Sequence, residues 1–279
     1  MEINGKQYIP NSGFRRIKLN WDCDKHGQFS TMWFVDKDDL PIGEPMCPKC
    51  KEEEYARERE ENSILYLQSI IRCELIEADV PEDNLENRFS NFIASTEYMQ
   101  QKVDICKSFV DRDNTIPSCL CFLGSTGTGK THLSVSCLAS IIIDNIRNNR
   151  QDDKLKYTRA SELMRDFKSI MNTKKGGTTE NQLIREYQTY AFLVIDELAR
   201  FVQGDYATSI MQEIISYRLE TNRKTILILN GTFNDLKTIL GEHNISRLIE
   251  KGKSLKFDEE DYRKKMQMER KNEESTNAV

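Results

Sequence analysis

The chain has 279 residues, of which 38% are hydrophobic and 30% are charged, so it is long enough for about two domains with one sizeable core. Lys and Arg total 40 against 45 Asp and Glu, and the net charge of −5 excludes a globally cationic protein that coats nucleic acid. No apolar run approaches the ~20 residues of a membrane span, and the first ten residues lack the apolar centre of a secretion signal. We therefore expect a soluble, cytoplasmic protein with no membrane partner.

Four side chains suited to a metal ion gather in the first fifty residues. Cys23-x-x-His26 and Cys47-Pro-Lys-Cys50 form two short knuckles. Zn²⁺ favours tetrahedral coordination by sulfur and nitrogen, and a two-residue spacer lets both ligands of a knuckle reach one ion. Because four protein ligands leave no open position for a substrate, we predict a structural zinc ion.

The residues between the two knuckles predict a small β-hairpin. Large or β-branched side chains alternate with the period of a strand from Phe29 to Val35, and a turn is expected near residues 38–43. We expect residues 1–52 to form a zinc-ribbon-like domain held by the metal. The alternative is four reduced side chains without an ion, but so short a segment with few aliphatic residues would then lack a core.

A charged helix is predicted after the second knuckle, over residues 51–80. Its second half becomes amphipathic, and Pro81 ends it. We expect residues 53–80 to be a helical linker. The apolar positions on one face of this helix are Ile64, Leu67, Ile71, Leu75 and Ala78.

From residue 81 to 257, apolar strand-like runs alternate with helix-period segments, the pattern of an α/β domain with a largely parallel sheet. Thr179 with Gln182 predicts a capping box at the start of one helix. The polar residues 258–279 are expected to be disordered. The expected strands are 119–124, 155–160, 191–196, 225–230 and 254–257. The expected helices are 130–147, 161–172, 180–189, 206–221 and 233–240.

The segment GSTGTGKT at residues 124–131 matches the phosphate-binding pattern G-x-x-x-x-G-K-[ST] in full. Phosphate oxygens need several backbone N–H groups converging at a helix start, and glycines let the chain curl closely enough to present them. An apolar strand before the loop and a helical pattern after it disfavour a chance glycine-rich turn. We expect Lys130 to reach the β- and γ-phosphates of ATP or ADP, and the Thr131 hydroxyl to ligate Mg²⁺. The expected nucleotide-binding residues are Gly124, Ser125, Thr126, Gly127, Thr128, Gly129, Lys130, Thr131, His132 and Asp196.

Two acidic residues, Asp196 and Glu197, follow the apolar run of residues 192–195. A buried parallel strand delivers such side chains to the crevice where ligands bind, although two solvated acids at a strand end are the simpler alternative. We expect Asp196 to hold Mg²⁺ with its water shell and Glu197 to orient or deprotonate the attacking water. An activated water favours a hydrolase over a nucleotide kinase, which uses an acceptor site instead. Asn230, after the next strand, is expected to hydrogen-bond the γ-phosphate or that water, although an Asn-Gly pair alone also forms turns.

The motifs GSTGTGKTHL, FLVIDEL, MQEIISYRLETNRKTILILNGTF and GEHNISRLIEKG together resemble the AAA+ ATPase domain of DnaC/DnaI-type replicative helicase loaders. That family also includes the transposase-helper ATPases. Residues 78–92 are similar to the family's segment that precedes the phosphate loop and flanks the adenine. The resemblance covers about residues 78–257. It implies an ATP hydrolase with a P-loop AAA+ three-layer fold, a parallel sheet and no substantial lid.

The resemblance also implies a role for Arg247 in the segment SRLIE. This residue matches the family's arginine finger, which acts on nucleotide held by the neighbouring subunit and supplies charge to the transition state. A surface arginine on a helix is the alternative. The family commonly has a second arginine four residues earlier, where this chain has His243. A finger acting between subunits requires self-association through the AAA+ domain, so we expect slow hydrolysis by the protein alone. The expected catalytic residues are Lys130, Glu197, Asn230 and Arg247.

The same resemblance implies the partners. Family members bind single-stranded DNA within the ATPase domain, and some carry an amino-terminal zinc-binding domain that docks on the hexameric replicative helicase. We therefore predict an ATP-dependent helicase loader in DNA replication, whose residues 1–52 grip the helicase. Candidate contacts to the DNA backbone are Lys154, Lys156, Lys174 and Lys175.

Two other functions fit the same residues. A transposase-helper ATPase would have the same fold and a different client. A zinc-ribbon DNA-binding regulator would use its phosphate loop to bind nucleotide without hydrolysing it.

Overall fold

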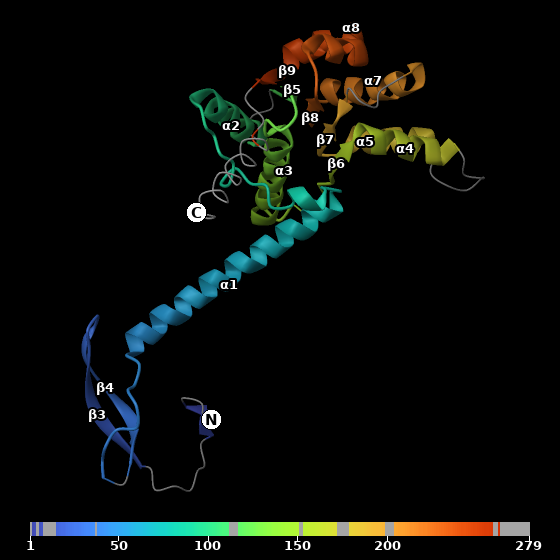
Figure 1. Cartoon of the computed structure of the whole chain (residues 1–279). Coiled ribbons are helices and arrows are strands. Elements are labelled where there is room, and N and C mark those ends of the chain that lie inside the picture. The colour runs from blue at the N-terminus through green and yellow to red at the C-terminus, as the bar shows by residue number, and fades with distance from the viewer. Residues whose placement is uncertain are drawn as a thin grey trace, which may run out of the picture. The chain divides into compact units, whose positions relative to one another are not determined.

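The computed structural model describes two compact units, residues 1–68 and 69–279 (Figure 1). Its first fourteen residues contribute only the backbone of two short antiparallel strands, β1 (Glu2–Ile3) and β2 (Lys6–Gln7). The remaining described residues are 15–36, 38–111, 117–150, 153–171, 179–198, 204–258 and 262.

The first unit contains a β-hairpin whose turn lies inside the first cysteine knuckle. Strand β3 (Arg15–Cys23) pairs antiparallel with β4 (Gly27–Val35) along its whole length. The turn closes with a hydrogen bond from the His26 N–H to the Cys23 carbonyl, 3.2 Å, and Gly27 follows at φ 73°. Glycine adopts this left-handed conformation without steric cost.

The prediction that residues 38–43 form the turn of this hairpin is therefore wrong, because the turn lies between Cys23 and Gly27. That segment makes a separate tight turn, in which the Asp36 carboxylate accepts the N–H groups of Asp38 and Leu40, each at 2.9 Å. A single bridge between Val35 and Pro41 closes it. The strand before the turn was missed, although Ile17, Leu19 and Trp21 alternate with polar residues there.

Helix α1 (Pro48–Glu77) begins inside the second cysteine knuckle, earlier than the 51–80 segment predicted. Proline fits the first helical position because its missing N–H has no intrahelical partner there. The predicted apolar face is buried only near the end of the helix: Ile71 and Leu75 are 4% and 0% exposed, whereas Ile64 is 50% exposed. The helix ends where the Val80 N–H bonds the Leu75 carbonyl at 2.9 Å.

The second unit is built on a five-stranded parallel sheet with the order β6-β7-β8-β5-β9. All five strands match the predicted runs, with β9 starting two residues early. Their bounds are β5 (Cys119–Gly124), β6 (Leu155–Arg159), β7 (Phe192–Asp196), β8 (Lys224–Leu229) and β9 (Gly252–Phe257).

Helices cover both faces of this sheet, which confirms the expected three-layer α/β fold (Figure 1). Side chains such as Ile195 and Leu227 pack against one helical layer, and their strand neighbours Val194 and Ile228 face the other. The first layer is α4 (Ala160–Met171), α5 (Glu180–Thr189), α7 (Asp205–Glu220) and α8 (Phe233–Lys251). The second is α2 (Glu97–Val110) and α3 (Lys130–Arg147).

Two helices differ from the prediction. Helix α2 was not expected; the Thr96 hydroxyl caps it by accepting the Met99 N–H at 3.1 Å. Helix α8 was expected to end at residue 240, but it continues to Lys251 past a break at Gly241, where φ is 74°. The capping box of Thr179 and Gln182 is confirmed on α5.

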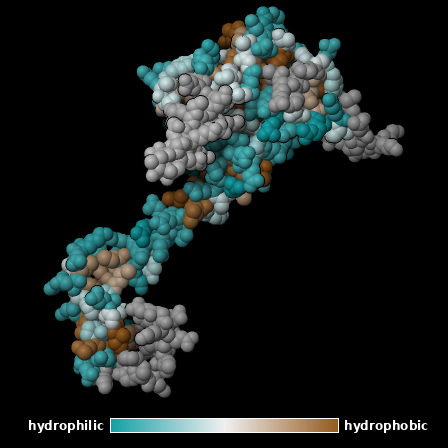
Figure 2. Space-filling view, viewed as in Figure 1, coloured by the Kyte–Doolittle hydropathy of each residue, from teal (hydrophilic) through white to brown (hydrophobic). Residues whose placement is uncertain are grey.

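The part of the second unit's surface shown in Figure 2 is mostly hydrophilic, in agreement with the charged composition. Among the described residues, no helix combines the length and apolar content needed to cross a membrane. Most of the predicted disordered tail, residues 258–279, lies outside the described residues.

Candidate functional site

The phosphate loop joins the end of β5 to the start of α3 and depends on glycines. Gly124, Gly127 and Gly129 have φ values of 138°, 76° and 90°. A Cβ atom on Gly124 would lie 1.8 Å from the Phe257 carbonyl oxygen, and one on Gly129 would lie 2.7 Å from the Phe92 ring. The loop conformation therefore requires glycine both for its backbone angles and for its close neighbours.

Lys130 is buried at the first turn of α3, with 5% of its surface exposed. Its ammonium group donates to the carbonyls of Gly124 (3.1 Å) and Ser125, so the positive charge lies inside the loop. Burial lowers the pKa of Lys130, while the nearby Asp196 opposes that shift. The Thr128 hydroxyl also donates to the Ser125 carbonyl at 2.9 Å and closes the loop on itself.

The acidic strand end faces the loop directly. The Thr131 hydroxyl donates to Asp196 Oδ2 at 2.9 Å, although the two residues are far apart in the sequence. The other oxygen, Asp196 Oδ1, accepts the Glu197 N–H at 2.6 Å. Asp196 is 5% exposed, and Tyr157 on β6 donates a further hydrogen bond to Oδ2 at 2.7 Å.

Glu197 has an unusual backbone for a residue with a side chain. Its φ is 57°, in the left-handed region, at the position directly after β7. Such a conformation costs about 1–3 kcal/mol and persists only where the surrounding structure enforces it, which is common at functional sites. The strain singles out Glu197 among the acidic residues of this unit that lie near the phosphate loop.

A cavity of about 650 Å³ opens between these groups. Its walls are residues 126–132 of the loop and α3, the pair Asp196 and Glu197, Asn230 after β8, and the segment from Asn84 to Met99. Its remaining wall includes Tyr262, whose N–H donates to the Gly127 carbonyl at 3.1 Å. The structure thus brings together around the cavity every predicted nucleotide-site residue except Gly124 and Ser125, whose carbonyls accept the Lys130 ammonium.

The segment before α2 also lines the cavity, although none of its residues was among the predicted site residues. Phe92 lies edge-on to the His132 ring, with 5.1 Å between centroids. His132 Nε2 is 3.0 Å from both the Arg88 carbonyl and the Asn91 side-chain oxygen, and burial lowers the pKa of this histidine. His132 lines the cavity but makes its polar contacts to this segment. The similarity of residues 78–92 to the family segment that precedes the phosphate loop was the sequence signal that could have predicted these contacts.

Arg247 does not line the cavity of its own chain. It lies on α8, where its guanidinium pairs with the Glu220 carboxylate of α7. That arginine lowers the pKa of Glu220 through a hydrogen bond, with a small contribution from His243. Of the predicted DNA contacts, Lys156 pairs with Asp79, while Lys174 and Lys175 lie outside the described residues.

Comparison with known proteins identifies the family. Residues 84–270 match the family described as IstB-like ATP binding protein. The chain belongs to this family. The IstB-like match covers the sheet, the phosphate loop and the acidic pair, and it excludes the cysteine knuckles. It confirms the resemblance recognised in the sequence.

Two curated relatives of this IstB-like chain are replicative helicase loaders named DnaC. The one from Buchnera aphidicola subsp. Baizongia pistaciae (strain Bp) is 28% identical over 179 residues, 64% of this chain and 70% of the relative. The one from Escherichia coli (strain K12) is 26% identical over 161 residues, 57% of this chain and 62% of the relative. The match to the E. coli protein therefore spans less than two thirds of its length.

Solved structures support the fold of the IstB-like unit. The crystal structure of the DnaC helicase loader has a TM-score of 0.53 at 21% identity and covers 64% of this chain and 100% of that chain. The crystal structure of DnaI has a TM-score of 0.51 at 16% identity, with 65% and 93% coverage. At these identities the likeness concerns the fold alone.

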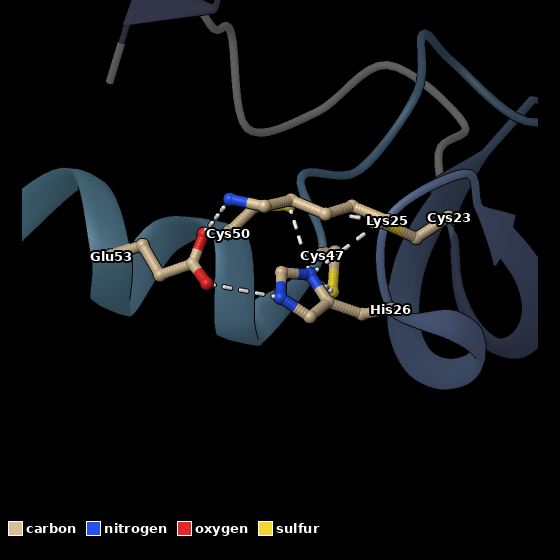
Figure 3. A network of polar contacts seen from close by, with 6 residues as sticks. All are labelled: Cys23, Lys25, His26, Cys47, Cys50 and Glu53. Atoms are coloured by element: carbon tan, nitrogen blue, oxygen red, sulfur yellow. Dashed lines mark hydrogen bonds and ion pairs between the residues drawn. The ribbon is translucent and has the colours of Figure 1, made fainter.

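Outside the IstB-like region, the four predicted metal ligands form one cluster (Figure 3). The donor atoms of Cys23, His26, Cys47 and Cys50 all lie within 4.8 Å of one another. His26 presents Nδ1 to the sulfurs, 3.3 Å from Cys50 and 3.8 Å from each of the other two. Its Nε2 lies 3.1 Å from Glu53, which also accepts a hydrogen bond from Lys25 at 2.5 Å.

The cluster fits a zinc ion in both chemistry and spacing. Zn–S bonds of about 2.3 Å in a tetrahedron place two sulfurs about 3.7 Å apart, and Cys23 and Cys50 are separated by 3.6 Å. Backbone N–H groups of the knuckle lower the pKa of Cys23 to about 7, while the neighbouring Cys23 raises the pKa of Cys50 to about 11. Ionising both thiols at this distance is therefore unfavourable, and a bound cation would remove that electrostatic repulsion.

Proposed function

We propose that this chain is a helicase loader of the DnaC/DnaI type that binds and hydrolyses ATP. The observation that carries the proposal is the hydrogen bond between Thr131 and Asp196 (2.9 Å), which joins the phosphate loop to the acidic strand end across one cavity. The family description and the two DnaC relatives support ATP binding and helicase loading, respectively.

The residues of the cavity fit a magnesium nucleotide. Hydroxyl and carboxylate oxygens are ligands that Mg²⁺ prefers, and Thr131 and Asp196 would hold the ion there. When bound, Mg²⁺ would neutralise charge on the β- and γ-phosphates. Lys130 would contact the same phosphates from within the loop, in place of its contacts to the Gly124 and Ser125 carbonyls.

Glu197 would orient the attacking water or take its proton. Its strained backbone at φ 57° places it at the cavity wall beside Asp196. Asn230, on the wall contributed by β8, would hydrogen-bond the γ-phosphate or this water. The arrangement supports hydrolysis over transfer to a second substrate.

Arg247 would complete the site of a neighbouring subunit. Its position on α8, away from its own cavity, supports action between subunits rather than within one. Self-association would then exchange the Glu220 contact of Arg247 for the neighbour's phosphate. ATP hydrolysis should accordingly rise with protein concentration.

The first unit would dock on the hexameric replicative helicase, and the ATPase unit would bind single-stranded DNA. Exposed apolar side chains in the first unit support a binding role: Leu40 is 62% exposed and Met46 is 53% exposed. Lys154 remains a candidate DNA contact, whereas Lys156 already pairs with Asp79.

The proposal is tested by ATP turnover and by capture of the replicative helicase from the native cell. Glu197→Gln should abolish turnover while retaining ATP binding, and the full-length protein should capture the helicase. Capture of a transposase instead would assign the transposase-helper function. Unchanged turnover in Glu197→Gln, or no nucleotide binding by the wild type, would contradict the proposal.

A further inference from the structure

Tyr157 occupies a buried position beside the acidic strand end. It lies in the middle of β6 and is 1% exposed. In the parallel register, Tyr157 pairs with Val194, so its side chain and that of Asp196 share one face of the sheet two residues apart. The Tyr157 hydroxyl donates to Asp196 Oδ2 at 2.7 Å, across neighbouring strands.

Three donors fix the Asp196 carboxylate, and Tyr157 differs from the other two. Glu197 donates its N–H to Oδ1 and follows Asp196 in the chain, so this contact is local. Thr131 donates to Oδ2, and its hydroxyl is also the expected ligand of Mg²⁺. Tyr157 alone among the three reaches Asp196 from a different strand without being an expected metal ligand.

The chemistry of Tyr157 suits a permanent donor. A carboxylate can only accept hydrogen bonds, so the phenol hydroxyl is the donor in this 2.7 Å contact. A fixed donor on one oxygen restricts rotation of the carboxylate, as partners of metal ligands commonly do.

We propose that Tyr157 is a positioning residue that orients Asp196 and thereby sets the affinity of the site for the divalent ion that accompanies the nucleotide. This inference rests on the proposed function of the cavity. It concerns a residue outside the phosphate loop and the acidic pair. Loss of the hydroxyl should weaken metal binding while leaving the contacts of the loop to the nucleotide intact.

The test is Tyr157→Phe in the full-length protein, because phenylalanine keeps the buried ring and removes the donor. Mn²⁺ binding in the presence of ADP, followed by electron paramagnetic resonance, should weaken roughly tenfold. The affinity for fluorescent ADP in EDTA should stay unchanged. The matched control is Tyr187→Phe, which removes the hydroxyl of another buried tyrosine, bonded to the exposed Asp166 carboxylate at 3.1 Å, on the opposite face of the sheet.

The outcomes separate this inference from the proposed function. Weaker Mn²⁺ binding in Tyr157→Phe with wild-type affinity in Tyr187→Phe supports the positioning role. If Asp196→Asn loses Mn²⁺ and Tyr157→Phe binds it like the wild type, the role of Tyr157 is excluded and the proposed function stands. If the wild type binds neither ADP nor Mn²⁺, both proposals fail.

Discussion

The two units differ in what stabilises their interiors. In the described part of the first unit, Val35 and Cys47 are the only buried hydrophobic residues. In the second unit, helices cover both faces of the sheet, and strand residues such as Leu120 and Leu193 are 0% exposed. A hairpin with so little apolar burial needs a metal to hold it, whereas the larger unit has a core of its own. We infer that zinc is part of the first fold and that nucleotide is a ligand of a complete second fold.

The two sites also differ in how their residues are assembled. All four metal donors lie between Cys23 and Cys50, in two knuckles at a strand turn and a helix start. The cavity instead draws residues from Asn84 to Tyr262. A local site can be recognised from spacing alone, whereas a dispersed site depends on the register of a parallel sheet.

The largest expected effect is that of removing zinc. Structural zinc contributes on the order of 10 kcal/mol in small metal-dependent domains, so chelation or Cys47→Ser should unfold the first unit. The protein's two tryptophans, Trp21 and Trp33, both lie in its hairpin, and their fluorescence should shift to longer wavelength. ADP affinity should remain unchanged. Unchanged tryptophan fluorescence in the metal-free protein would contradict the inference that the first unit needs zinc to fold.

A second expected effect destabilises the other unit and leaves the zinc unit folded. Arg218 on α7 is 1% exposed, and burial lowers its pKa to about 9. Its guanidinium donates to the carbonyls of Tyr187, Tyr190 and Lys224 at 2.7–3.0 Å, and so fixes α5 and the starts of two strands.

Arg218→Met would leave these buried carbonyls without their donor, at a cost of about 3–5 kcal/mol. The measurement is thermal unfolding followed by circular dichroism, with the exposed Arg185→Met as the control. The tryptophan fluorescence of the first unit should keep its wild-type value below the transition. Equal melting temperatures for the two variants would show that Arg218 does not stabilise the second unit.

These features show what the sequence could predict. The phosphate loop and the buried strands were predicted closely because their patterns are local and strongly apolar. The strand at Arg15–Cys23 was missed because its few apolar residues gave a weak signal, and α8 was shortened because Gly241 resembles a helix end. Tyr157 carried no local signal, since only the pairing of β6 with β7 brings it to Asp196.

The third expected effect concerns the nucleotide as a ligand of a folded unit. Lys130→Ala removes the ammonium from the loop and should weaken ATP binding at least ~100-fold, because charge-assisted hydrogen bonds to phosphate are lost. The melting temperature without nucleotide should change little, in contrast to the effect of removing zinc from the first unit. Calorimetric titration measures the affinity, with the exposed Lys253→Ala as the control. Unaltered ATP affinity would mean that the phosphates bind elsewhere.

The smallest expected effect is a change in zinc affinity on substitution of Glu53, the hydrogen-bond partner of the predicted ligand His26. Glu53 contacts His26 Nε2 at 3.1 Å and, through its other oxygen, Lys25 at 2.5 Å (Figure 3). A carboxylate in this position fixes the tautomer that presents Nδ1 to the metal and makes that nitrogen a better ligand. Glu53→Gln should lower zinc affinity roughly tenfold in competition with a chelating dye.

At saturating zinc, the Glu53→Gln protein should keep the wild-type tryptophan fluorescence, because the four ligands still close the site. Glu52→Gln, one residue earlier on the same exposed helix turn, is the control. If both variants bind zinc equally, His26 needs no partner and the spacing of the knuckles alone sets the affinity. If Glu53→Gln unfolds the hairpin even in excess zinc, then Glu53 is a structural link between turn and helix, and the first unit depends on more than its metal.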